Sequence, residues 1–200
     1  MKYSKIEIGP NSFKECQKLT EFEIPSTVTF IGERAFMGCS SLSKIKIPAS
    51  VVKIKEGAFS RCQSLKEIEI PSSIESIDDF TFYNCSSLRH VMIPSSVKLI
   101  GMSSFQYCSS LVEITFPSSL TSIGKDSFSG CSSLSKISIP SSVKKIGESS
   151  FCGCSSLSEV SFEDPCSLSS IEEGTFKDCS SLATITIPSS VDSIGSFAFK

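Results

Sequence analysis

One phrase of about 23 residues returns from one end of this chain to the other. Residues 93–115 read IPSSVKLIGMSSFQYCSSLVEIT, and residues 139–161 read IPSSVKKIGESSFCGCSSLSEVS. A fixed period of this length is the signature of a solenoid, in which each copy forms one coil and buries its apolar side chains against its neighbours. The repeat therefore constrains the architecture more strongly than any other feature of the sequence.

Each repeat can be numbered from the apolar residue that precedes its proline, so that Ile93 is position 1 and Pro94 is position 2. Position 13 is then always phenylalanine and position 16 always cysteine, so we predict that both columns lie in a shared core. The phenylalanines are Phe13, Phe36, Phe59, Phe82, Phe105, Phe128, Phe151, Phe176 and Phe199. The cysteines are Cys16, Cys39, Cys62, Cys85, Cys108, Cys131, Cys154 and Cys179.

The spacing within one repeat predicts a strand, a turn and a return segment. Ile45 and Ile47 are two residues apart, so they share one face of a strand, which Pro48 then ends. The serines that follow the proline can bond the backbone of the turn. Position 9 is glycine in six of nine copies, which suits a tight bend with positive φ. Positions 10 to 16 are expected to return the chain as short turns or helical segments.

The motif L-x-x-I-x-I-P-S-S-V-x-x-I-G-x-x-A-F-x-x-C-S-S resembles the BspA-like, or Treponema pallidum-type, leucine-rich repeat family. The resemblance implies a right-handed curved solenoid with a parallel β-sheet on its concave face. Members of that family occur on bacterial surfaces and in parasitic protists. It therefore implies a surface or secreted adhesion module, without a cofactor, that binds a host extracellular-matrix or cell-surface protein.

We expect one leucine-rich-repeat domain over residues 1–200, with about eight full repeats, partial repeats at both ends and a two-residue insertion near 163–167. Charge is balanced, with 19 Lys and Arg against 21 Asp and Glu, so nothing predicts nucleic-acid binding. No apolar run is long enough to span a membrane, and the first residues lack a signal-peptide core. An intracellular scaffold is thus the alternative, and self-assembly through uncapped ends is a third hypothesis.

The ten cysteines suggest free thiols rather than disulfides. Stacked coils hold equivalent Cβ atoms about 5 Å apart, whereas a disulfide needs about 3.8 Å. Buried thiols acting as small apolar groups are the better interpretation, and they fit a reducing compartment. A metal site at Cys152 and Cys154 lacks a third ligand.

Nothing in the sequence predicts an enzyme. His90 is the only histidine, and a cysteine or serine nucleophile needs a positioned base. No phosphate-binding loop, zinc-binding cysteine pair or carboxylate pair is present. We therefore predict no catalytic residue, no metal and no cofactor.

Positions 21 and 23 flank the inward residue of the strand and are predicted to face the concave side. The charges at position 21 alternate in sign almost without a break, and position 23 is charged in the first three coils and mostly hydroxyl-bearing in the last four. Alternation keeps exposed strands soluble and in register whatever their function. That structural interpretation is the favoured one; the alternative is a recognition strip. Its candidate residues are Glu21, Glu23, Lys44, Lys46, Glu67, Glu69, His90, Met92, Glu113, Lys136 and Glu159, with Glu163, Asp164 and Cys166 in a loop at its rim. Asn84 begins a glycosylation sequon whose use the sequence leaves open.

Overall fold

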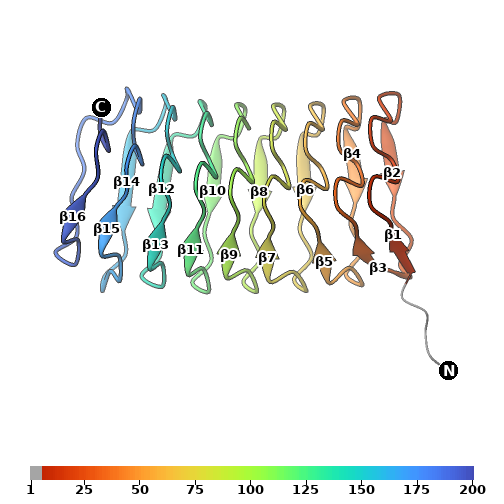
Figure 1. Ribbon diagram of the computed structural model, residues 1–200, viewed down its shortest axis with the longest axis horizontal. Helices are drawn as coiled ribbons and strands as arrows, with labels where there is room; N and C mark the ends of the chain where they lie inside the picture. Colours follow the sequence, from red (N-terminus) through yellow and green to blue (C-terminus); the bar gives the residue numbers. More distant parts are fainter. Residues whose placement is uncertain (1–5) are drawn as a thin grey trace.

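The computed structural model describes residues 6–200, which form a row of stacked coils (Figure 1). The first five residues, which belong to the predicted domain and to the segment considered for a signal peptide, lie outside the described residues. Most coils have a strand of three or four residues on one side, a strand of two to four residues on a second side and a series of turns on the third. All strand pairs are parallel, so the predicted solenoid is confirmed.

The first sheet carries the residues at positions 21 to 23. Its strands are β2 (Glu21–Glu23), β4 (Lys44–Lys46), β6 (Glu67–Glu69), β8 (His90–Met92), β10 (Glu113–Thr115), β12 (Lys136–Ile139) and β14 (Glu159–Phe162). The repeat count predicted eight strands here, but residues 184–186 of the last full coil form none. Thr184 follows Glu159 by 25 residues instead of 23, because the two-residue insertion lies between them.

The second sheet lies on the neighbouring side of the coils and carries positions 7 and 8. Its strands are β1 (Ile6–Ile8), β3 (Val28–Ile31), β5 (Lys53–Ile54), β7 (Ser76–Ile77), β9 (Leu99–Ile100), β11 (Ser122–Ile123), β13 (Lys145–Ile146), β15 (Ser170–Ile171) and β16 (Ser193–Ile194). The inward side chains of both sheets meet in one continuous apolar core.

The phenylalanine column runs through the centre of that core, as predicted. Successive rings stack with centroids 5.0–5.7 Å apart from Phe13 to Phe199. Phe36 and the equivalent rings up to Phe151 are fully buried, whereas Phe199 is 42% exposed. A ring at either end of the described stack has one stacked neighbour instead of two.

The third side consists of turns, with no helix among the described residues, so of the two expected forms the short turns are present. The N–H of Ala35 donates to Gly32 O within its own coil, but the N–H of Phe36 donates to Ala58 O of the next coil. This alternation repeats in the other coils. An α-helix would keep all of these bonds within one segment. Here the segment is a chain of turns that also joins neighbouring coils.

Positive φ falls at positions 11 and 15, not at the predicted position 9. The φ values there lie between 52° and 75°, as at Arg34 and Gly38. The position-9 glycines serve a different purpose. A Cβ on Gly124 would lie 2.6 Å from the carbonyl carbon of Gly101 and 2.7 Å from the N atom of Met102. Glycine is therefore needed for the close approach of one coil to the next.

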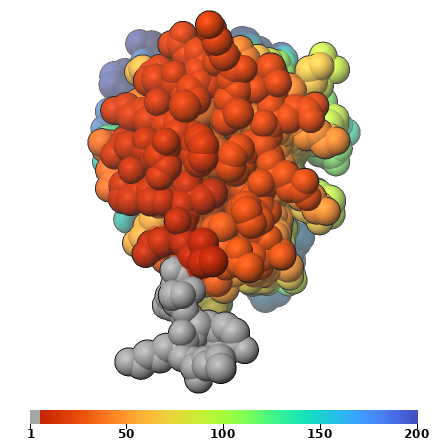
Figure 2. Space-filling model, turned by 90° about the vertical axis from the view of Figure 1, so that its right-hand side faces the viewer, coloured from red at the N-terminus to blue at the C-terminus, as the bar shows by residue number. Residues whose placement is uncertain are grey.

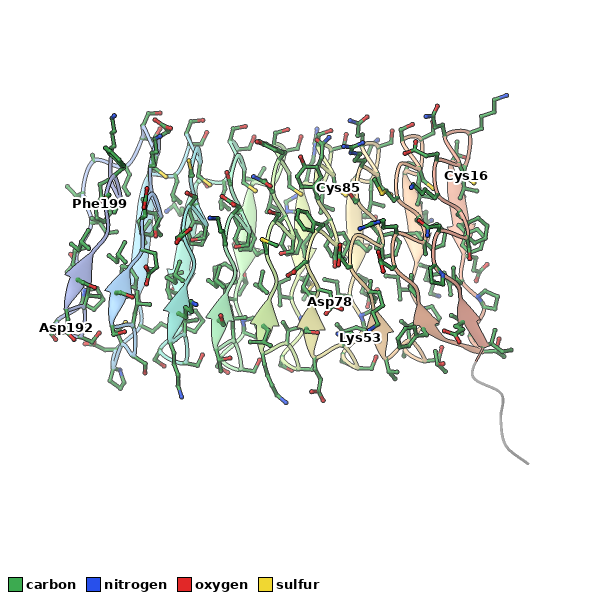
Figure 3. All side chains as sticks on the ribbon, in the orientation of Figure 1. Cys16, Lys53, Asp78, Cys85, Asp192 and Phe199 are labelled. Atoms are coloured by element: carbon green, nitrogen blue, oxygen red, sulfur yellow. The ribbon has the colours of Figure 1, made fainter. Side chains whose placement is uncertain are left out.

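Cysteine and serine side chains also join the coils. The Cys62 thiol donates to the carbonyl of Phe36 at 3.2 Å, and equivalent bonds of 3.1–3.3 Å run along the column. Ser96 donates to the carbonyl of Ile74 in the preceding coil at 2.6 Å. All ten cysteines are free thiols. Seven of the eight in the column are buried, and Cys16 in the first described coil is exposed (Figure 3).

The second sheet is interrupted twice, between β5 and β7 and between β13 and β15. We call these two intervals the seams. At both, position 9 of the later coil is not glycine but Asp78 or Glu172. The ammonium of Lys53 crosses the first seam and lies 2.6 Å from a carboxylate oxygen of Asp78 (Figure 3). Turn hydrogen bonds on the third side continue across both seams.

Candidate binding surface

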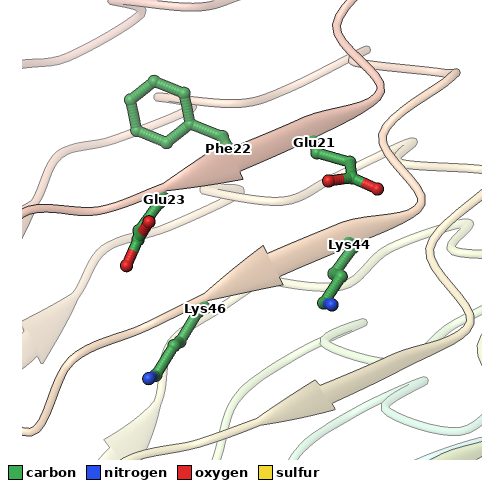
Figure 4. A pocket seen from close by; sticks show the side chains of 5 residues that line it. All are labelled: Glu21, Phe22, Glu23, Lys44 and Lys46. Carbon is green, nitrogen blue, oxygen red and sulfur yellow. The ribbon is translucent and has the colours of Figure 1, made fainter.

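The eleven residues predicted for the first sheet all expose their side chains. The inward residue between each pair is buried in every strand except β2, where Phe22 is half-buried and packs against Phe13 and Phe36. Parallel register places Glu21 beside Lys44 and Glu23 beside Lys46 (Figure 4). The sheet therefore holds two rows of side chains, at positions 21 and 23, in lateral register.

Few of these charges neutralise one another. In the part of the chain that the structure describes, Lys136–Glu159 is the one ion pair between two of these residues, with N and O atoms 2.7 Å apart. This hydrogen bond raises the pKa of Lys136. Lys44 and Lys46 lie in register with Glu21 and Glu23, and Glu67 and Glu69 lie in register with His90 and Met92. Among residues 6–200, none of these four charged groups forms an ion pair within 4.0 Å, so all four remain exposed on the sheet.

A groove lies over β4, β6 and β8, with a volume of about 490 Å³. Its floor includes Ile45 and Ile68, and its walls are the charged pairs of β4 and β6. β4 and β6 are not joined in a hydrogen-bonded ladder, so the groove follows an interruption of the first sheet. Met92 borders it and is 80% exposed. Seen from the N-terminal end, side chains of these and later coils stand out along one side of the molecule (Figure 2).

The later strands carry fewer charges. Position 23 is Thr115 in β10, Ser138 in β12 and Ser161 in β14, and position 21 alternates between glutamate and lysine. His90 has Glu67 on one side and Glu113 on the other. The charged and apolar parts of the surface are thus concentrated in the first four strands.

The rim loop lies away from this groove. Glu163 donates its N–H to the carbonyl of Ile139 at 2.9 Å, and its carboxylate accepts the N–H of Ser141 at 3.4 Å. Cys166 is half-buried against the core, and Asp164 is exposed. The loop follows β14, and β10 and β12 separate that strand from the groove. The loop therefore borders the far end of the predicted strip, at β14, and not the groove.

Two features of the surface were not predicted from the sequence. The groove depends on the missing ladder between β4 and β6, which has no signature in the repeat. The second feature is a cluster of aromatic side chains, Phe80, Tyr83 and Tyr107, on the third side of the coils. Its signal was available, because other copies place mostly small, polar or charged residues at those repeat positions.

Within residues 6–200, no three His, Cys, Asp or Glu side chains are grouped as metal ligands. Cys154 is buried and donates its thiol to the carbonyl of Phe128, while Cys152 is half-buried. Over the same residues, no helix has the length and apolar character needed to cross a membrane.

Comparison with known proteins agrees with this geometry. The model of the BspA type leucine rich repeat region matches residues 6–134 and 75–200, so the chain belongs to this family. Repeats of the family generally form non-catalytic binding modules. No protein of curated function matches the chain.

Three solved structures are similar. The Treponema pallidum leucine-rich repeat protein is 32% identical with a TM-score of 0.70, over 76% of this chain and 71% of that one. A leucine-rich cell surface protein from Faecalibacterium prausnitzii is 28% identical with a TM-score of 0.53, over 96% and 67%. A leucine-rich repeat protein from Eubacterium ventriosum is 30% identical with a TM-score of 0.61, over 90% and 42%.

Proposed function

We propose that the protein is a protein-binding module of a surface or secreted adhesion protein, and that its contact surface is the charged first half of the first sheet. The observation that carries this proposal is the pair of registered, unpaired charge rows around the groove over β4 to β8. Charges that lack an internal partner are available to a binding partner, and complementary charge mainly sets its orientation and association rate.

The groove supplies the apolar component that charged rows lack. Protein interfaces combine a desolvated apolar centre with a polar rim, and methionine is enriched in such centres. Met92, which is 80% exposed, supplies this apolar contact above the buried Ile45 and Ile68, with Lys44 and Glu67 as rim. A partner with an apolar side chain between an acidic and a basic group fits the surface.

The proposed location rests on similarity. One similar structure is described as a cell surface protein. All three similar structures come from bacteria. The seven buried free thiols favour the alternative, an intracellular scaffold, since they suit a reducing compartment. Protease treatment of intact source cells separates the two, because only a surface protein is cleaved before lysis.

The binding surface is tested by charge reversal. Immobilised extracellular-matrix proteins (fibronectin, fibrinogen, laminin and collagen) are titrated with the wild-type chain and with Lys44→Glu/Lys46→Glu. We expect a dissociation constant raised about tenfold or more for the double variant, with most of the change in association rate at low salt. Ser138→Glu/Ser161→Glu, on the same sheet but outside the groove, is the matched control. Equal loss in both variants would remove the groove from the proposal.

A further inference from the structure

The aromatic cluster on the third side is separate from the first sheet and has no role in the core. Phe80 and Tyr83 have ring centroids 5.9 Å apart, and Tyr83 and Tyr107 have centroids 5.8 Å apart, both in edge-on contacts. Tyr107 is 47% exposed, and Phe80 and Tyr83 are partly exposed. These rings stand outside the phenylalanine column that the fold requires.

Two of the three rings occupy backbone conformations that aromatic residues rarely adopt. Phe80 has φ 55° at position 11, and Tyr107 has φ 61° at position 15. Most other copies use Gly, Asn, Asp, Ser, Arg or Glu at these positions. Bulky residues with positive φ are outliers, and such strain is concentrated at functional sites.

Small neighbours leave the rings accessible. Gly57 precedes Phe80 at position 11, and Gly130 follows Tyr107 at position 15. A Cβ on Gly130 would lie 2.6 Å from the Cδ1 atom of Tyr107, so the ring lies directly over this glycine. The aromatic side chains are therefore supported by backbone and not covered by larger side chains of the adjoining coils.

The surroundings of the cluster are polar, with one charge of each sign at the edge. Residues 80–88 and 99–112 contain no Asp, Glu, Lys, Arg or His. Asp79 directly precedes Phe80, and Arg61 of the preceding coil donates its N–H to the carbonyl of Tyr83 at 2.7 Å. Asn84 and Gln106 supply amides next to the rings. Within the described residues, neither the Tyr83 nor the Tyr107 hydroxyl has a hydrogen-bond partner, so both are available to a ligand. A phosphate-bearing ligand would need an excess of lysine or arginine, whereas Arg61 and Asp79 at the edge of the cluster leave no net charge.

We propose that this cluster is a binding site for a neutral polysaccharide chain. The apolar C–H faces of a pyranose ring pack against aromatic rings, and its hydroxyls bond to uncharged amides and hydroxyls. A protein partner is the weaker fit, since a stable protein interface needs about 800 Å² on each side and 20–30 residues. Three rings and their short rim suit a few sugar units.

Native-gel affinity electrophoresis in dextran, mannan, galactan, arabinoxylan or laminarin tests the proposal. The variants are Phe80→Ser and Tyr107→Asn, because the chain already uses Ser103 and Asn84 at these repeat positions with φ 52° and 54°. Phe197→Ser is the matched control. Phe197 shares position 11 with Phe80, has φ 58° against 55°, is 57% exposed and lies far along the chain from the cluster. Melting curves confirm that all three variants fold.

The expected result is retardation by at least one of these polysaccharides. Phe80→Ser and Tyr107→Asn should raise the dissociation constant about tenfold or more, while Phe197→Ser, Lys44→Glu/Lys46→Glu and added salt leave it unchanged. No retardation by any member of the panel would overturn the proposal, as would equal weakening by Phe197→Ser. A concentration-dependent dimer that Tyr107→Asn abolishes would also overturn it, by showing that a second copy occupies the cluster.

Discussion

The stretch from β7 to β13 and the two seams that bound it are built from the same repeat but differ in how the coils are joined. Within the stretch, every coil after the first has glycine at position 9, and the second sheet is continuous. At the seams that position is Asp78 or Glu172, and the ladder is broken. Stacked phenylalanine rings are 5.2–5.4 Å apart inside the stretch but 5.7 and 5.6 Å apart across the seams.

The difference shows that side-chain packing and backbone pairing are separable in this solenoid. Across the first seam the Cys85 thiol still donates to the carbonyl of Phe59 at 3.2 Å. Phe59 and Phe82, the phenylalanines on the two sides of this seam, are fully buried. The core therefore carries the stack through places where one ladder fails. Lys55 is the third residue at position 9 that is not glycine, yet β3 and β5 still pair there. A residue larger than glycine therefore does not always interrupt the ladder.

The largest expected effect tests whether the core is continuous. Phe105→Ala inside the stretch and Phe82→Ala beside the first seam should each lower the free energy of unfolding by about 3–5 kcal/mol, because both rings are fully buried between two others. Phe199→Ala should have a smaller effect, since that ring is 42% exposed. Chemical denaturation measures all three. A much smaller loss at Phe82 than at Phe105 would mean that the seam weakens the core as well as the ladder.

The repeat made the solenoid, the phenylalanine column and the outward rows at positions 21 and 23 predictable, because a strict period assigns each side chain to one side of a coil. It did not predict what depends on contact between successive coils. Gly124 is required because the preceding coil lies so close to it. Arg34 and Gly38 have positive φ because of the geometry of the turns in which they lie. The groove and the aromatic cluster depend on departures from the repeat, which a consensus hides.

The second prediction concerns glycine at position 9. Gly124→Ala should destabilise the protein by about 1–3 kcal/mol, because the added Cβ would meet backbone atoms at 2.6–2.8 Å and force the coils apart. Gly9→Ala is the matched control, since among the described residues its Cβ would meet only the Ser12 hydroxyl at 3.4 Å, and no described coil precedes it. Thermal melts compare the two variants. Equal effects would show that position 9 needs glycine for its backbone freedom and not for close approach.

The third prediction uses the thiol column, which passes through the seams. Burial raises the pKa of Cys108 and of Cys179 from the ordinary value of 9.0 to about 12. Below pH 9 these thiols are protonated in both the folded and the unfolded state. Above it the unfolded chain releases protons that the folded chain retains, so stability falls as pH rises toward 12, by about 1.4 kcal/mol per pH unit for each such thiol.

Denaturation at a series of alkaline pH values measures this slope. Cys108→Val removes one buried thiol, so the free energy of unfolding should fall less steeply with pH, by about 1.4 kcal/mol per pH unit. Cys179→Val, beside the second seam, should have the same effect. An unchanged slope in Cys108→Val would mean that other groups govern alkaline unfolding. A change in only one of the two variants would show that the seam alters the thiol column.

The smallest expected effect addresses the side chains that cross the first seam. Lys53 lies 2.6 Å from Asp78 and 2.9 Å from the Ser76 hydroxyl, with both charged groups partly buried. Lys53→Gln should lower stability by about 0.5–1 kcal/mol, and added salt should narrow its difference from the wild type. Lys125→Gln removes an exposed ion pair to Glu148 inside the stretch, where the ladder already joins the coils, and should change stability less. Equal or reversed effects would mean that Lys53 does not compensate for the missing ladder, and that the core alone holds the seam together.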